Sequence, residues 1–172
     1  MAKLGINTLG KVVGHVDGPL IDEGIRQVEE IREKLLNVPI DLIISSPLRR
    51  AIETAEIINR NRNIPILIDE RARERNLGIY EEISPNEEKF NEIRYYSKNV
   101  AVPSGEDSHT FTKRVFEFLD DVIKEHKGDK DTILIVTHGM FLRSVSWYFK
   151  GFPNDDEIIH RVENCQMDEY EV

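Results

Sequence analysis

The sequence predicts an α/β layered domain with a mostly parallel β-sheet. The prediction rests on short apolar runs that alternate along the chain with longer segments whose apolar residues recur at helical spacing. Short apolar runs of this kind are typical of strands buried on both faces, as in parallel sheets. The chain has 172 residues, of which 40% are hydrophobic, so we expect a single domain over residues 1–172.

The expected elements follow one another in order. Apolar spacing of three or four residues predicts helices over 22–37, 51–58, 86–96, 108–125 and 140–149. Apolar runs predict strands over 41–45, 64–68 and 132–136. The last run is the most strongly apolar and is expected to be the most buried, whereas Pro65 places the second nearer a sheet edge. The tail from residue 157 is expected to hold one or two edge strands.

Composition narrows the classes of partner. Acidic side chains outnumber basic ones by 32 to 23, which disfavours nucleic acid and anionic membranes. Cys165 is the single cysteine, so neither an internal disulfide nor a cysteine-ligated zinc site is expected. No apolar run approaches the roughly 18–20 residues of a membrane span, and residues 1–5 do not resemble a signal peptide. We therefore expect a cytoplasmic protein with no metal and no cofactor.

Polar segments follow the predicted strands, at the sheet edge where such folds bind ligands. After the first strand, residues 45–51 read Ser-Ser-Pro-Leu-Arg-Arg-Ala. Ser46 is a candidate N-cap, and Pro47 suits the first position of a helix. Arg49 and Arg50 in the first helical turn oppose the helix dipole unless an anion binds there. The alternative is that both arginines are solvated or pair with nearby acids.

Two further segments lie at strand ends. His138, within the Thr-His-Gly of residues 137–139, ends the last predicted strand, although a histidine there can also be a cap or a core residue. Residues 71–78 form a charged loop that by itself suggests a solvated surface, but Glu74 in that loop can donate a proton to a leaving group. Together the segments predict a phosphate-ester site built from arginine, histidine and an acid. The remaining histidines are expected in solvent: His15, His109, His126 and His160.

These segments, in this order, resemble the motifs of the histidine phosphatase superfamily, the phosphoglycerate-mutase-like fold. Residues 45–55 resemble its S-S-x-L-x-R-A-x-x-T-A motif, and residues 74–78 resemble its E-x-x-x-G loop. Residues 137–139 resemble its second-histidine motif, and residues 7–27 the segment that follows its signature. The resemblance implies a three-layer sandwich in which helices flank a mostly parallel sheet.

The resemblance also implies roles for single residues. Arg50 would hold the phosphoryl group, Glu74 would act as general acid and then as general base, and His138 would stabilise the transferring phosphoryl group. Further phosphate-binding positions are implied at Asn7, Gly14 and Gly139. Candidate substrate contacts are implied at Val13 and Arg75. The implied partner is a small phosphorylated metabolite.

The family signature, Arg-His-Gly with a nucleophilic histidine, does not occur in the sequence. In the family this histidine lies six positions before the asparagine that matches Asn7, so Met1 stands in its place. The first strand of the family fold, which is interior, is therefore expected to be missing, and its exposed neighbour would favour a homodimer. Either the start is mis-called and the intact protein is longer, or the protein is a shortened homologue that cannot form a phosphohistidine.

The resemblance favours phosphomonoester hydrolysis through a phosphohistidine for the intact protein, and weak or no activity for the chain as given. The alternatives are an inactive phosphate-binding homologue with a regulatory role and a phosphoglycerate mutase. Hydrolysis is preferred because the segment between Glu74 and Gly105 is short and has few cations. Val13 also stands where mutases tend to have a hydroxyl residue. An unrelated receiver-like α/β domain is a further alternative, but the sequence lacks the acidic cluster that it predicts.

Overall fold

The computed structural model of the chain describes residues 12–84, 86–93, 95–126, 131–152 and 162–172. Asn7, an expected phosphate contact, lies outside these residues. The expected absence of a first strand also concerns the chain ahead of the described part and stays a prediction. None of the helices within the described residues is both long and apolar enough to cross a membrane.

Three parallel strands form the sheet, in the order β2-β1-β3. The central strand β1 (Leu42–Ser45) pairs on one side with β2 (Ile66–Ile68) and on the other with β3 (Ile133–Val136). Both pairings are parallel and run to the last residue of β1, where Ser45 lies opposite Ile68 and Val136, so the carboxyl ends of the strands meet at one edge. Within the described residues β2 is an edge strand, as Pro65 predicts.

The expectation that residues 132–136 form the most buried strand is wrong. Three of the four residues of β3 are only partly buried, whereas Ile43 and Ile44 of β1 are buried almost completely. Within the described residues β3 has a strand neighbour on one side only, and β1 has one on each side. The burial of a strand depends on its position in the sheet, and a local apolar run does not encode that position.

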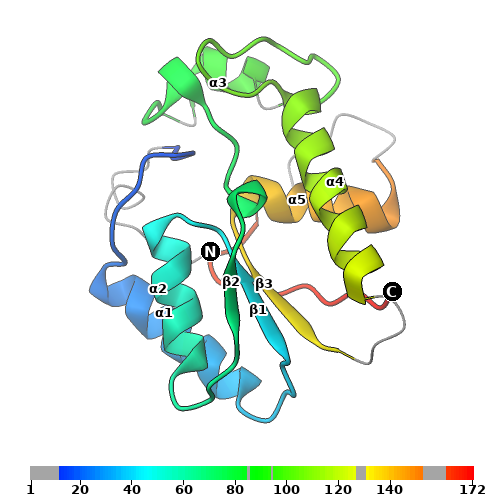
Figure 1. Ribbon diagram of the computed structural model, residues 1–172. Coiled ribbons are helices and arrows are strands. Elements are labelled where there is room, and N and C mark those ends of the chain that lie inside the picture. Colours follow the sequence, from blue (N-terminus) through cyan, green and yellow to red (C-terminus); the bar gives the residue numbers. More distant parts are fainter. Residues whose placement is uncertain (1–11, 85, 94, 127–130, 153–161) are drawn as a thin grey trace.

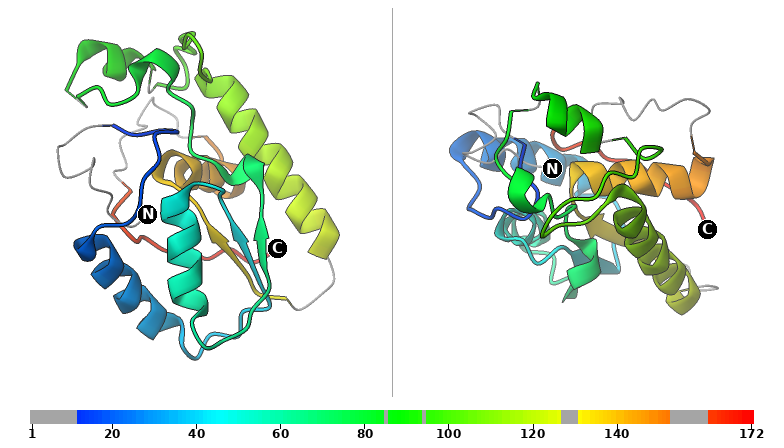
Figure 2. Two further views of the ribbon diagram at one scale, coloured as in Figure 1. Left: turned by 60° about the vertical axis from the view of Figure 1, so that its left-hand side comes forward. Right: turned by 90° about the horizontal axis from the view of Figure 1, so that it is seen from above.

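Helices cover both faces of the sheet and make a three-layer α/β sandwich (Figure 1). One face is covered by α1 (Asp22–Leu35) and α2 (Arg49–Asn59). The other is covered by α4 (Ser108–His126) and α5 (Gly139–Lys150). Figure 2 shows the same division from two further directions. The fold that the family resemblance implies, with a parallel sheet between helical layers, is confirmed.

Alternating side chains along the strands fill the two cores. Ile43 of β1 packs in the cluster formed with α1 and α2, and the next residue, Ile44, packs in the cluster formed with α4 and α5. On β3, Leu134 and Ile135 divide in the same way. Successive side chains of a strand point to opposite faces, so an apolar run serves a sheet that is covered on both sides.

A further apolar cluster lies beyond the carboxyl edge of the sheet, where the chain between β2 and α4 folds over that edge (Figure 1). This segment holds η2 (Glu70–Ala72), η3 (Gly78–Tyr80) and α3 (Glu88–Ile93), the last shorter than the predicted 86–96. Its small apolar cluster is separate from the two main cores and is made of Leu77, Phe90, Ile93 and Val102. The cluster anchors an otherwise irregular segment above the strand ends.

The edge strands expected in the tail are not found in its described part, residues 162–172. There the ring of Tyr170 stacks on Phe149 of α5, with ring centroids 4.3 Å apart and planes inclined by 15°. In its described part the tail thus contacts a helix and does not pair with the sheet. The rest of the tail segment, residues 157–161, lies outside the described residues.

Truncation of Ile43 tests the central position of β1. We expect Ile43→Ala to lower the free energy of unfolding by about 2–5 kcal/mol, because the side chain is fully buried (0% exposed) and its removal leaves a cavity. The matched control is Leu67→Ala on β2, where the residue is 51% exposed and the expected change is within about 0.5 kcal/mol. Urea denaturation followed by circular dichroism measures both. Equal losses would contradict the assignment.

Candidate functional site

Arg50, Glu74 and His138 converge at the carboxyl edge of the sheet. Arg50 lies in the first turn of α2 after β1, Glu74 follows β2 and η2, and His138 lies between β3 and α5. All three are buried, with exposed fractions of 2%, 3% and 0%. Because each follows one of three neighbouring parallel strands, the topology alone brings them to the same place. The sequence placed these three at strand ends, and the structure brings them together.

The guanidinium of Arg50 is held by a strap, defined here as residues 12–17. Its Nη2 donates to the carbonyl oxygen of Gly14 and its Nη1 to that of Val16, both at 2.8 Å. Its Nε donates to Nδ1 of His138 at 3.3 Å. A guanidinium has five N–H donors, so the hydrogen bonds with the described residues leave two of them for a ligand.

Burial of the Arg50 guanidinium is offset by acids around it. Removal from water lowers the pKa of Arg50, whereas the charges of Glu74, Asp17 and Glu81 raise it. One Asp17 oxygen lies 3.9 Å from Nη1. Arginine has so high an ordinary pKa that the group stays charged. The Arg50 guanidinium is therefore a permanent cation in a largely dry setting.

His138 is a neutral imidazole with a defined tautomer. An arginine N–H can only donate, so Nδ1 of His138 carries a lone pair toward Arg50 and the ring proton lies on Nε2. Nε2 is 2.7 Å from Oγ of Ser46. Burial lowers the pKa of His138 well below its usual value, and the charge of Arg50 acts in the same direction. Both ring nitrogens are thus engaged inside the protein.

Ser46 is not the N-cap of α2, contrary to the sequence expectation. The helix begins at Arg49, and the preceding Leu48 makes no side-chain cap. The strap caps the helix instead. The main-chain N–H of Arg49, the first residue of α2, donates to both carboxylate oxygens of Asp17, at 2.9 and 3.0 Å. A cap supplied from 32 residues away in the chain leaves no sign in the local pattern.

The carboxyl group of Glu74 faces the N-terminus of α5. Its Oε1 accepts from the main-chain N–H of Arg75 at 2.9 Å, and its Oε2 accepts from that of Met140 at 3.1 Å. Burial raises the pKa of Glu74, and the opposing effects of these N–H groups and of Arg50 and Arg143 are smaller. A carboxyl group whose pKa is raised holds its proton more readily than an exposed one, which suits general acid chemistry.

The other expected site residues have different surroundings. Gly14 has no room for a side chain, because a Cβ there would collide with the carbonyl of Arg75 and the carboxylate of Glu81. Gly139 is the first residue of α5, and a Cβ there would lie 4.0 Å from Oε2 of Glu74. Val13 is buried in the strap.

Arg75, a candidate substrate contact, is buried and engaged by main chain. Its Nε donates to the carbonyl of Glu106 at 2.9 Å and its Nη1 to that of Ile93 at 2.6 Å. Nη2 has no hydrogen-bond partner among the described residues. These bonds hold Ile93 and Glu106, later in the segment between β2 and α4, against the loop that carries Glu74. A contact of Arg75 with substrate stays a prediction.

Two neighbours of the site were missed by sequence reasoning. His15 was expected in solvent, but its Nε2 lies 2.8 Å from the carbonyl oxygen of Glu74. Glu81 accepts hydrogen bonds from the strap through both carboxylate oxygens. Both lie in irregular segments, where no periodicity indicates which way a side chain points. Their identification requires the tertiary structure, which brings the strap beside residues 74 and 81.

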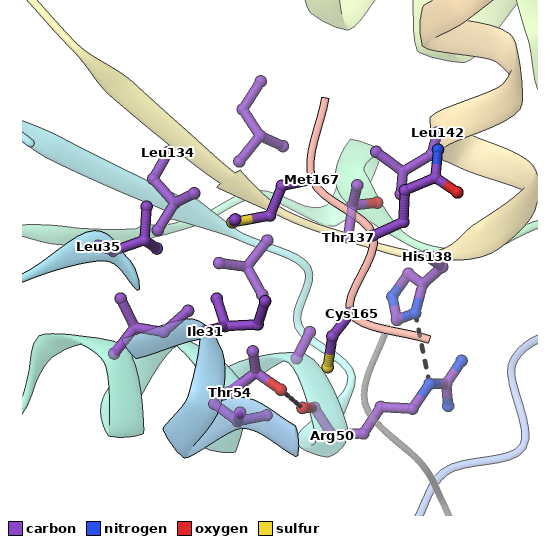
Figure 3. A pocket seen from close by; sticks show the side chains of 16 residues that line it. Ile31, Leu35, Arg50, Thr54, Leu134, Thr137, His138, Leu142, Cys165 and Met167 are labelled. Carbon is purple, nitrogen blue, oxygen red and sulfur yellow. Dashed lines mark hydrogen bonds between the residues drawn. The ribbon is translucent and has the colours of Figure 1, made fainter. Parts of the chain in front are cut away.

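A cavity of about 80 Å³ adjoins the site (Figure 3). Arg50 and His138 form one end, and Leu35 and Leu134 lie at the other. The lining is mostly apolar and does not include Glu74. The cavity therefore reaches the cation and the imidazole of the site but not its acid, and it is distinct from the space where the three groups converge.

Protonation of His138 provides a test of this geometry. We expect the ring to be neutral at pH 6 with its proton on Nε2, because burial and the charge of Arg50 both oppose protonation. An unfolded histidine binds a proton near pH 6.5, so the contribution of His138 to folding stability is present above that pH and falls as the pH drops below it. Side-chain ¹⁵N NMR measures the charge and the tautomer of the His138 ring. The Arg50→Gln variant should raise the pKa of His138, because it removes a neighbouring positive charge. An imidazolium or an Nδ1–H ring at pH 6 would contradict the hydrogen bond from Arg50.

Known proteins resemble the chain over almost its whole length. The family model of the histidine phosphatase superfamily (branch 1) matches residues 3–172. A relative from Yersinia pestis (strain Pestoides F), named "Probable phosphoglycerate mutase GpmB", is 30% identical over 167 residues, which cover 94% of this chain and 77% of the relative.

Solved structures agree. YhfR from Bacillus stearothermophilus is similar with a TM-score of 0.81 at 29% identity, covering 94% of this chain and 81% of that one. The alpha-ribazole phosphatase from Shigella flexneri is similar with a TM-score of 0.79 at 27% identity, covering 95% of this chain and 83% of that one. With the fold, the order of the motifs and the family match in agreement, the chain belongs to the histidine phosphatase superfamily.

Proposed function

We propose that the site binds the phosphoryl group of a small phosphomonoester and serves hydrolysis of that ester. The observation that supports this most is the convergence of a buried guanidinium, a neutral imidazole and a carboxyl group of raised pKa. Arg50 binds the phosphoryl oxygens through the two N–H groups that its hydrogen bonds with the described residues leave over, and its charge offsets theirs. The N-terminus of α5, at Gly139, adds a favourable dipole.

Glu74 supplies the proton that hydrolysis needs. As a nucleophilic nitrogen bonds to phosphorus and the P–O ester bond breaks, the protonated carboxyl group gives its proton to the leaving oxygen; water then displaces that nitrogen from phosphorus, and the carboxylate takes the proton of the water. In the family mechanism a histidine nucleophile carries the phosphoryl group between these steps. No Arg-His-Gly occurs in this sequence, and His138 has both nitrogens engaged. Residues 1–172 thus provide the phosphate ligand and the acid.

An inactive phosphate-binding homologue is the second candidate. It is favoured by the same engagement of His138 and by the three Arg50 donors that bind protein acceptors. A mutase, which the name of the Yersinia relative suggests, is less well supported because a second phosphate needs cations. In the described part of the segment between β2 and α4, Lys89 pairs with Glu92 at 2.7 Å and Lys98 lies over the ring of Tyr95.

Phosphate affinity separates the role of Arg50 from that of its neighbour. We expect Arg50→Ala to weaken binding of inorganic phosphate by about 1.5–3 kcal/mol, the range of a charge-assisted hydrogen bond, which is roughly a 10- to 150-fold loss. Arg49→Ala removes the same charge one residue away, where the side chain is 63% exposed and pairs with Glu53, and should change affinity by about twofold or less. Titration calorimetry on folded variants measures both. Equal effects would remove Arg50 from the site.

Hydrolysis of p-nitrophenyl phosphate tests the role of His138. We expect residues 1–172 to hydrolyse it no faster than the His138→Ala variant does, because neither ring nitrogen is available to attack phosphorus. Robust activity that disappears in His138→Ala would instead identify His138 as the nucleophile and contradict the assignment.

An extended gene product that includes an Arg-His-Gly strand ahead of residue 1 distinguishes the two candidates. Hydrolysis by that product would support the hydrolase. A folded product that binds phosphate through Arg50 but stays inert would support the phosphate-binding homologue.

A further inference from the structure

Glu81, which directly follows η3, collects main-chain donors from two segments. Its Oε2 accepts from the N–H of Gly14 at 2.7 Å, and its Oε1 accepts from the N–H of His15 at 2.8 Å and of Leu77 at 3.1 Å. The carboxylate therefore joins the strap to the loop that carries Glu74. Charge-assisted hydrogen bonds to main chain are short and directional, so this junction fixes geometry as well as distance.

The strap is fastened on either side of this junction. At its start, the N–H of Val12 donates to the carbonyl of Ile83 at 3.0 Å, and the N–H of Glu82 donates to the carbonyl of Val12 at 2.9 Å. At its end, Asp17 accepts from the main-chain N–H of Arg49 at the start of α2. Between these points the strap passes directly over the guanidinium of Arg50.

One peptide group connects Glu81 with Arg50. The carbonyl of Gly14 accepts from Arg50 Nη2, and the N–H of the same peptide group, which belongs to His15, donates to Glu81 Oε1. The peptide is trans, so its C=O and N–H point in opposite directions. An anion and a cation thus hold a single peptide plane from its two ends, and the peptide dipole is aligned with their field.

We propose that Glu81 is a positioning residue that fixes the Arg50 guanidinium for phosphoryl binding through the Gly14–His15 peptide. The proposal rests on the proposed function, in which Arg50 is the phosphate ligand. Glu81 has no contact with the ligand in this scheme. It determines where the strap carbonyls lie, and these determine which guanidinium N–H groups are bound to protein and which face the phosphoryl oxygens.

The sign of its effect distinguishes positioning from simple charge. Glu81 is near enough to raise the pKa of Arg50, and a negative charge there opposes a bound anion. If Glu81 acted only through its field, its neutralisation would strengthen phosphate binding. If it acts by positioning, its neutralisation weakens phosphate binding although a repulsive charge is removed.

The test compares phosphate affinity in Glu81→Gln and Glu82→Gln by titration calorimetry on the full chain. Glu82 is exposed and contacts the strap through its main chain, so its substitution removes the same charge at the same turn without breaking the junction. We expect Glu81→Gln to weaken binding of inorganic phosphate roughly 3- to 30-fold, which lies within the range for residues that share one hydrogen-bond network. Glu82→Gln should leave it unchanged or slightly stronger. Unchanged or tighter binding in Glu81→Gln would overturn the proposal.

Two further measurements make the outcome specific. In an Arg50→Ala background, Glu81→Gln should have no additional effect on phosphate affinity, and a full additional loss would overturn the proposal. If Glu81→Gln does not fold, Glu81→Asp keeps the charge but shortens the reach, and it should weaken binding in the same way. A wild-type chain that does not bind phosphate, or binds it independently of Arg50, would refute the proposed function. Arg50-dependent binding with no effect at Glu81 would refute this inference alone.

Discussion

The buried guanidinium of Arg50 is the constraint on which the surrounding structure depends. A cation removed from water is stable in a protein only when acceptors and opposite charges replace its hydration. Here they come from two strap carbonyls, from the imidazole of His138 and from the acids around it. Two strap carbonyls and the tautomer of His138 are arranged so as to satisfy this one group.

The two other site residues respond to the same burial in opposite directions. Burial raises the pKa of Glu74 and lowers that of His138, because in each case the uncharged form is favoured where water is excluded. The site thus combines a guanidinium that stays charged with an imidazole and a carboxyl group whose pKa values are both shifted toward the uncharged form. This combination suits a phosphoryl group, which needs a cation for its oxygens and a proton for its leaving oxygen.

The features predictable from sequence were those encoded by nearby residues. Apolar periodicity identified the strands and most helices, and strand-end position together with the family motifs singled out Arg50, Glu74 and His138. The errors concern contacts between distant segments: Asp17 rather than Ser46 binds the first N–H of α2, and β1 rather than β3 is the most buried strand. His15 and Glu81 were missed because side-chain direction in irregular segments is set by tertiary packing and not by local pattern.

Localisation of a bound oxyanion tests the central claim most directly. Orthovanadate resembles a transferring phosphoryl group, and a crystal structure of the chain with vanadate would show where such a group sits. We expect vanadate oxygens within hydrogen-bond distance of the Arg50 guanidinium, on the side that the strap leaves open, with the Glu74 carboxyl group beside them. Vanadate ordered elsewhere on the molecule, with Arg50 still enclosed by the strap and His138, would contradict the account.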